Sequence, residues 1–170
     1  MTIKIIGAVL VICACTGFGF RFAALHKKCE RSLVELVQVI DYLICQIKYQ
    51  KTPLALLFKQ AAVSTSGSFK RLLLSFGEEL ESQVFPDIYI CMKRLLGKFP
   101  DIPPTSKELL IKMSTTLGKF DLNGQILELE GVRNEAIGKI KTLAENRDVR
   151  LRTYQTLGLC AGAALAILFV

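Results

Sequence analysis

The sequence is poor in the residue types that carry catalysis and metal binding. It has no tryptophan and a single histidine, His26, among its 170 residues. Neither a second histidine nor a cysteine stands at ligand spacing from His26, so we interpret it as a helix-surface residue rather than a metal ligand. The six cysteines form no C-x-x-C pair, which excludes the common zinc-ribbon and dithiol redox motifs. We therefore predict no metal and no disulfide framework, as expected of a reducing compartment.

Other catalytic patterns are also missing. Gly17 and Gly19 lie inside an apolar segment and lack the strand, turn and lysine that a phosphate-binding loop requires. The densest acidic cluster, residues 78–81, shares a predicted helix with two basic residues, which is typical of a solvated face and not of paired catalytic carboxylates. The sequence thus predicts a protein that is not an enzyme, uses no cofactor and takes no small-molecule substrate.

Acidic residues are fewer than basic ones, and the imbalance has a definite location. There are 22 Lys and Arg against 15 Asp and Glu, a formal net charge of +7. Residues 32–146 carry 14 basic and 13 acidic side chains and are therefore nearly neutral. The excess lies in residues 21–31 and 147–152, beside the two uncharged ends of the chain. A nucleic-acid-binding face would concentrate positive charge on the folded domain, so we predict no nucleic-acid partner.

Apolar residues, by contrast, are abundant. They make up 51% of the chain, and the mean hydropathy is +0.40. Residues 5–20 and 153–170 contain no charge. Because a membrane-spanning helix needs about 20 predominantly apolar residues, we predict transmembrane segments at 1–22 and 153–170 and one domain, 23–152, between them. On the second segment Gly158, Gly162 and Ala166 stand four residues apart, a spacing typical of close helix packing.

The basic flanks also predict the topology. Cytoplasmic flanks of membrane spans collect Lys and Arg, so we place the central domain in the cytoplasm and both termini across the membrane. A cleaved signal peptide is the alternative interpretation of the N-terminal segment, and it would make the central domain a secreted one. Basic residues directly after the apolar segment disfavour that export.

The central region has the pattern of helices almost throughout. From Cys29 to Ile47, apolar residues recur with the 3.6-residue period of an amphipathic helix. Similar patterns follow, separated by residues that start or stop helices. These breaks are Thr52 as N-cap with Pro53 at the first helical position, 64–68, Pro86, 99–104 and Gly118.

The last helix is predicted to be the longest. Asp121 or Asn123 can cap it, and its apolar face leads into the second transmembrane segment. Gly131 and Gly138 each cost about 1 kcal/mol relative to alanine but do not forbid continuity. Six helices with short connections predict an all-α fold, a six-helix antiparallel bundle whose first and last helices continue as transmembrane helices.

Three short segments and the two spans together resemble a known family. Residues 3–8 read IKIIGA, residues 47–54 read IKYQKTPL and residues 117–121 read LGKFD. In their order and spacing, between an N-terminal and a short C-terminal span, they resemble the stage III sporulation protein AB family over essentially the whole chain. Where that family often has glycine after the tyrosine, this chain has Gln50, which weakens any inference of a tight turn there.

The resemblance implies both a fold and a role. The fold it implies is a cytoplasmic six-helix bundle similar to the domain of type II secretion platform proteins. The role it implies is that of a scaffold in the channel complex between mother cell and forespore. The complex would lie in the mother-cell membrane that engulfs the forespore, the outer forespore membrane. A cytoplasmic ATPase and ring-forming membrane proteins are the partners implied.

Seven residues at two connections are candidate partner contacts. They are Tyr49, Thr52, Pro53 and Leu54 at the first connection and Leu117, Gly118 and Asp121 before the last helix. Helix caps and core packing are the competing interpretation of the same residues. A functional alternative also stays open, in which the bundle senses anionic lipid through its basic flanks and controls another membrane protein.

Overall fold

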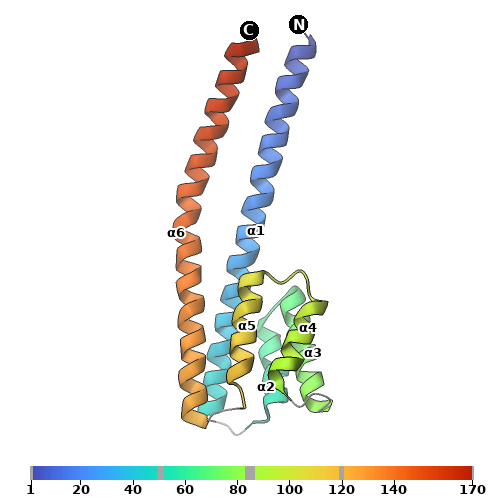
Figure 1. Ribbon diagram of the computed structural model, residues 1–170, viewed down its shortest axis with the longest axis vertical. Coiled ribbons are helices and arrows are strands. Elements are labelled where there is room, and N and C mark those ends of the chain that lie inside the picture. Colours follow the sequence, from blue (N-terminus) through green and yellow to red (C-terminus); the bar gives the residue numbers. More distant parts are fainter. Residues whose placement is uncertain (1, 50–51, 83–86, 119–120, 170) are drawn as a thin grey trace. The chain divides into compact units, whose positions relative to one another are not determined.

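The computed structural model describes the backbone of residues 2–49, 52–82, 87–118 and 121–169, and the side chains of these residues except 2–24, 26 and 146–169. The described residues form helices and turns and include no strand, which confirms the predicted all-α class. The elements are α1 (Thr2–Tyr49), α2 (Leu54–Ala61), the 3-10 helix η1 (Ala62–Ser64), α3 (Gly67–Ser82), α4 (Ile88–Lys98), α5 (Pro104–Thr116) and α6 (Leu122–Phe169), as shown in Figure 1.

The chain divides into two compact units. The first, Lys28–Ile140, contains the second half of α1, the helices α2 to α5 and the first part of α6. We call this unit the bundle. Within it, successive helices run in opposite directions (Figure 1), so the predicted six-helix antiparallel arrangement is confirmed. The second unit comprises Met1–Lys27 and Lys141–Val170, the terminal stretches of α1 and α6.

The terminal stretches are helical, as predicted. Helix α6 continues through Gly131 and Gly138 without a break. A helix with the length and hydropathy of a membrane span is not found among the residues whose side chains are described. The predicted spans, 1–22 and 153–170, lie outside those residues, and so do Gly158, Gly162 and Ala166 with their predicted packing, and His26.

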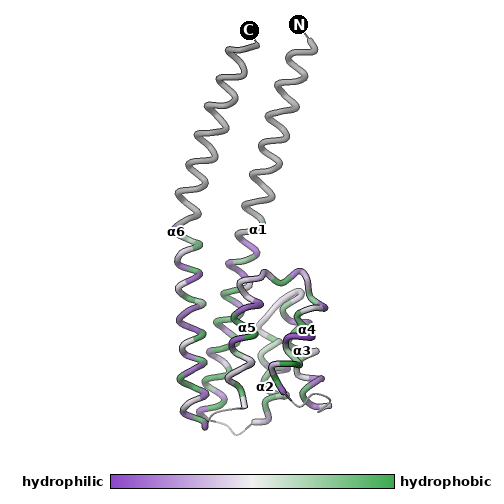
Figure 2. Tube along the Cα trace, in the orientation of Figure 1, coloured by the Kyte–Doolittle hydropathy of each residue, from purple (hydrophilic) through white to green (hydrophobic). Residues whose placement is uncertain are grey.

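The apolar stripes of the helices form the core of the bundle, and Figure 2 shows apolar and polar residues alternating along these helices. On α1, Leu33, Leu36 and Ile40 are completely buried, as their 3.6-residue period predicts. Val39 is buried as well, whereas Val37, which the period places on the stripe, is only half-buried. The buried arc of α1 is therefore rotated from the one predicted.

Neighbours on two sides of α1 explain this rotation. The hydroxyl group of Tyr42 donates a hydrogen bond of 2.7 Å to Oε1 of Gln60 on α2. On the adjacent position of α1, Asp41 pairs with Arg133 of α6. Which residues of α1 become buried depends on the positions of α2 and α6. The sequence pattern of α1 alone gives no information about those positions.

Helix α6 buries fewer of its predicted apolar residues than expected. Leu129, Val132 and Ala136 are completely buried. Ile137, predicted on the same face, is 40% exposed, and Leu127 is 69% exposed. Helix α6 lies at the edge of the bundle (Figure 1), so only part of its circumference is covered by other helices.

Helices α2 and α3 pack closely against each other. The rings of Phe58 and Phe76 meet edge to face, with their centroids 4.7 Å apart and their planes at 80°, a favoured aromatic geometry. Next to Phe76, a Cβ atom on Gly77 would lie 2.7 Å from Cγ of Lys59 and 2.9 Å from the backbone oxygen of Ala55. Only glycine lets the two helices approach this closely.

Capping and stop residues in the sequence predicted most of the helix ends correctly. Gly118 has φ = +82° directly after the C-cap Leu117, which confirms the predicted glycine stop of α5. Asp121 caps α6, since its Oδ1 accepts a hydrogen bond of 3.2 Å from the backbone nitrogen of Gly124. At the start of α2, however, Pro53 and not Thr52 occupies the N-cap position. The predicted boundary is wrong by one residue because the carbonyl group of Pro53 accepts the first helical hydrogen bonds.

The start of α4 differs slightly from the prediction. Asp87 is its N-cap, and the carboxylate accepts a hydrogen bond of 2.9 Å from the backbone nitrogen of Tyr89. Aspartate is a preferred N-cap because its side chain satisfies an amide that has no helical partner. Pro86, the predicted start, lies outside the described residues.

Candidate functional site

The polar side chains of the bundle form ion pairs between helices rather than a reactive cluster. Among the described residues, no three His, Cys, Asp or Glu side chains are placed to hold a metal ion. The acidic cluster on α3 makes ion pairs with other helices: Glu81 lies 2.6 Å from Nζ of Lys59 on α2, and Glu79 lies 3.5 Å from Nζ of Lys98 on α4. Glu78 and Glu81 are exposed, as the prediction of a solvated face requires, whereas Glu79 is half-buried.

Cys91 is the buried thiol of the bundle. It is 1% exposed, and its Sγ donates a hydrogen bond of 3.4 Å to Oε2 of Glu79. Burial, together with this hydrogen bond to a carboxylate, raises the pKa of the Cys91 thiol to about 12. Because the thiolate is the reactive form, Cys91 is a packing residue and not a nucleophile.

The two other described cysteines are also free thiols. Cys29 is half-buried and Cys45 is exposed. The sequence pattern places both on or beside the apolar stripe of α1, which is wrong for Cys45, because the stripe is rotated as described above.

The two segments predicted to contact partners lie at the same end of the bundle. The first joins α1 to α2 and the second joins α5 to α6. In an antiparallel bundle of consecutive helices, the first, third and fifth connections share one end, as can be followed in Figure 1. We call this the odd end of the bundle, and the end with the second and fourth connections the even end.

The odd end carries exposed apolar side chains. Tyr49 is 73% exposed, and Lys48 places its Nζ 5.6 Å from the centre of the Tyr49 ring. Leu122, the first residue of α6, is 57% exposed; sequence reasoning missed it because the helix pattern treats it as part of an apolar face.

The remaining candidates at the odd end differ in accessibility. Pro53 is exposed, and Thr52 and Leu54 are half-buried. Gly118 and Asp121 are exposed. Leu117 is only 2% exposed, so its side chain belongs to the core and is not available to a partner.

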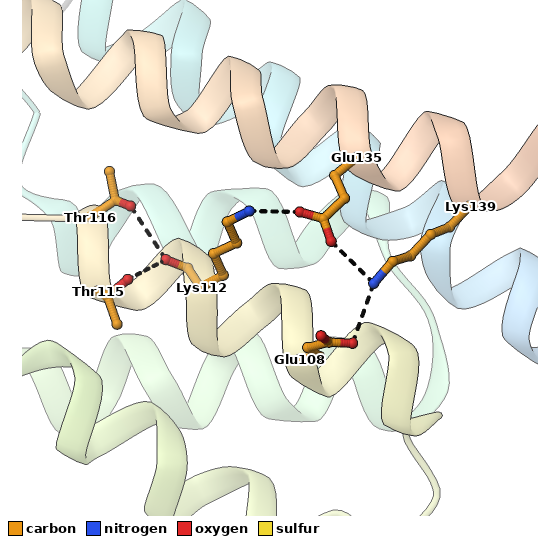
Figure 3. A network of polar contacts seen from close by, with 6 residues as sticks. All are labelled: Glu108, Lys112, Thr115, Thr116, Glu135 and Lys139. Carbon is orange, nitrogen blue, oxygen red and sulfur yellow. Dashed lines mark hydrogen bonds and ion pairs between the residues drawn. The ribbon is translucent and has the colours of Figure 1, made fainter.

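Helices α5 and α6 are joined by a polar network, shown in Figure 3. The carboxylate of Glu135 on α6 accepts a hydrogen bond of 2.7 Å from Nζ of Lys112 on α5 and lies 3.1 Å from Nζ of Lys139. Lys139 in turn donates to Glu108 over 3.3 Å. Hydrogen bonds from Lys112 and Lys139 lower the pKa of Glu135. Burial acts to lower the pKa of Lys139, but its hydrogen bonds to Glu135 and Glu108 outweigh burial and raise it.

Glu135→Gln is expected to remove part of the acid sensitivity of the bundle. The folded-state pKa of Glu135 lies below its ordinary value of 4.5, so its contribution to stability is complete above that pH and is lost as the pH falls through the folded-state value. Because the side chain is 34% exposed, solvent screening limits this contribution to about 1 kcal/mol. Urea unfolding of the chain in nonionic detergent at pH 7 and pH 3 measures it.

Glu128→Gln provides the matched control for this prediction. It removes an exposed carboxylate from the same helix, for which the described residues provide no ion pair. We expect it to leave the difference in unfolding free energy between pH 7 and pH 3 unchanged. An equal effect of both substitutions would contradict a specific role of the network.

Comparison with known proteins supports the fold over most of the chain. A family model described as stage III sporulation protein AB matches residues 4–170. A solved structure described as stage III sporulation protein AB (SpoIIIAB) is similar with a TM-score of 0.65 and 19% sequence identity, covering 72% of this chain and 98% of that one. At this identity the structural likeness is evidence for the fold alone. None of the curated proteins matches the chain.

Proposed function

The chain belongs to the stage III sporulation protein AB family, and from this premise we propose that it is a non-enzymatic scaffold of the channel complex between mother cell and forespore. The family match over residues 4–170 is the observation that carries the proposal. It is supported by the bundle itself, in which several ion pairs join different helices and the buried Cys91 thiol has a raised pKa.

The proposed scaffold is anchored at both ends. Residues 1–22 and 153–170 would cross the outer forespore membrane, with the bundle on the cytoplasmic side of the mother cell. This proposal rests on the two uncharged segments and on the basic residues of 21–31 and 147–152 that flank them. Gly158, Gly162 and Ala166 would then form a smooth face on the second span for packing against the first span or against another protein of the channel.

The proposed contact surface is the odd end of the bundle. Tyr49, the most exposed of its described apolar side chains, would be its centre, because a tyrosine ring buries a large area at low conformational cost. Leu122 is a second exposed apolar side chain at this end. Thr52, Pro53, Leu54, Gly118 and Asp121 belong to the same two connections, and Leu117 is left out because it is buried. The partners would be the cytoplasmic ATPase and the ring-forming membrane proteins of the channel.

Tyr49→Ala is expected to weaken partner recovery about fivefold in a crosslinking pull-down from sporulating cells, which corresponds to a loss of about 1 kcal/mol. The reason is the loss of the exposed ring at the centre of the contact surface. Immunoblots of the crosslinked products for the ATPase and the ring proteins provide the readout, and melting curves verify that the variant is folded.

Val63→Ala is the matched control, since Val63 is a 78% exposed apolar residue at the even end. It should leave partner recovery unchanged. If Tyr49→Ala and Val63→Ala both retain full recovery, the odd end is not the contact surface. If a tagged chain recovers no channel protein at all, the scaffold role itself is refuted.

A further inference from the structure

Helix α6 contributes little to the apolar core of the bundle. Over residues 122–140, the part of α6 that belongs to the bundle, the buried apolar side chains are those of Leu129, Val132 and Ala136. Helix α4 buries four side chains over only 11 residues, and all four are larger than alanine. Because the free energy gained by burial grows with the apolar area removed from water, the apolar face of α6 holds it less firmly than that of α4 does.

Ion pairs provide much of the contact between α6 and its neighbours. Three of them join α6 to α1 and α5, and the second and third are drawn in Figure 3. They are Arg133 with Asp41 at 2.5 Å, Glu135 with Lys112 at 2.7 Å, and Lys139 with Glu108 at 3.3 Å. The six side chains are 30–72% exposed. Ion pairs this accessible to solvent are weak, and dissolved salt screens them.

The backbone of α6 is also less stable within the bundle than an all-alanine or all-leucine helix would be. Gly131 and Gly138 lie in the helix interior, and glycine is a poor helix former. A Cβ atom at either position would meet nothing within 4 Å among the described residues. Close packing therefore requires glycine at Gly77 of α3 but not at these two positions. The two glycines make α6 easier to open without improving its contact with the bundle.

We propose that α6 is a separable arm of the bundle, which opens from α1 and α5 while the packing of α2 to α5 is retained. Opening breaks three solvent-accessible ion pairs and withdraws three apolar side chains from the core. It leaves the contact between Phe58 and Phe76 of α2 and α3 intact. Segments with few buried apolar contacts are those that open before the rest of a protein unfolds.

The role of this arm rests on the anchoring proposed above. Helix α6 continues without a break from the bundle to the proposed second span, residues 153–170. When α6 opens, this span can change its position while α2 to α5 stay packed. A channel protein that displaces the second span therefore does not unfold the bundle.

Hydrogen–deuterium exchange of the full chain in nonionic detergent, followed by mass spectrometry, tests the separation. Peptides covering residues 122–140 should exchange about tenfold faster than peptides covering α3. Raising the NaCl concentration from about 0.1 M to about 1 M shortens the screening length from about 10 Å to about 3 Å. This change should speed exchange in α6 about threefold and leave α3 unaffected. Equal rates in the two helices, or a rate in α6 that salt does not change, would overturn the proposal.

Two substitutions should move the opening of α6 in opposite directions. Gly131→Ala introduces a better helix former at a position with room for its Cβ atom, and it should slow exchange in α6 about fivefold. Lys112→Gln removes one ion pair between α5 and α6, and it should speed exchange about twofold and reduce the salt effect.

Lys93→Gln is the matched control for Lys112→Gln. It removes an exposed positive charge from α4, and Lys93 takes part in none of the three ion pairs of α6. Exchange in α6 should therefore stay unchanged. An equal response to Lys93→Gln and Lys112→Gln would indicate an effect of net charge and overturn the ionic attachment of α6. Exchange is measured without any partner, so a failed recovery of channel proteins would refute the scaffold role and leave the separation of α6 standing.

Discussion

Phe76→Ala is expected to lower the free energy of unfolding of the bundle by about 3–5 kcal/mol. Phe76 is completely buried, and its ring meets that of Phe58 edge to face across the α2–α3 contact. Its truncation removes this aromatic contact and leaves a cavity that the close approach of the two helices prevents from collapsing. Urea unfolding of the chain in nonionic detergent, followed by circular dichroism, measures the change.

Two further variants make this measurement specific. Phe76→Leu retains most of the buried volume and should lose less stability than Phe76→Ala. Val63→Ala removes a side chain that is 78% exposed and should change the unfolding free energy by no more than about 0.5 kcal/mol. A loss below 1 kcal/mol for Phe76→Ala would contradict the packing of α2 on α3 described above.

Gly77→Ala is expected to lower the free energy of unfolding by about 1–3 kcal/mol, the usual cost of overpacking. The added Cβ atom would lie 2.9 Å from the backbone oxygen of Ala55. A backbone atom of α2 cannot move aside alone, so the two helices must separate. The better helix propensity of alanine, worth up to about 1 kcal/mol, offsets only part of this cost.

Gly97→Ala is the matched control for Gly77→Ala. Gly97 also lies within a helix, α4, but a Cβ atom there would meet nothing within 4 Å. The same substitution should therefore stabilise the bundle, by up to about 1 kcal/mol, through helix propensity alone. Opposite signs for the two variants in the same unfolding assay are the expected outcome. A stabilising effect of Gly77→Ala would show that the α2–α3 contact is looser than described.

The charged residues of the chain fall into two groups. The excess positive charge lies mainly in residues 21–31 and 147–152, the basic flanks of the proposed spans, and residues 32–146 are nearly neutral. Inside the bundle, ion pairs such as those around Glu135 join neighbouring helices (Figure 3).

The helix ends could be predicted largely from residues that are neighbours in the sequence. Gly118 was predicted as the stop of α5 and Asp121 as one of two possible caps of α6, and both are confirmed. These signals act within one turn of the helix, so the sequence contains all the information needed. Thr52 was misplaced because a proline next to a threonine permits two neighbouring cap positions, and the prediction selected the wrong one.

The candidate surface was predictable only in part. The connection residues were found from their positions between helices, and Tyr49 is indeed exposed. The burial of Leu117 was not predictable, because an apolar C-cap can point inward or outward, depending on the helix that lies beneath it. Leu122 was missed for the same reason, since its exposure depends on how much of α6 its neighbours cover.

The sequence by itself determined the all-α class, the six helices, most of their ends and the location of the excess charge. These properties depend on side-chain period, capping and charge, which involve residues close together in the chain. Only the tertiary structure decided that Val39 and Leu117 are buried, that Gly77 lies against Ala55, and that Arg133 of α6 pairs with Asp41 of α1. Such contacts join residues far apart in the chain, and they exist only once the helices have packed.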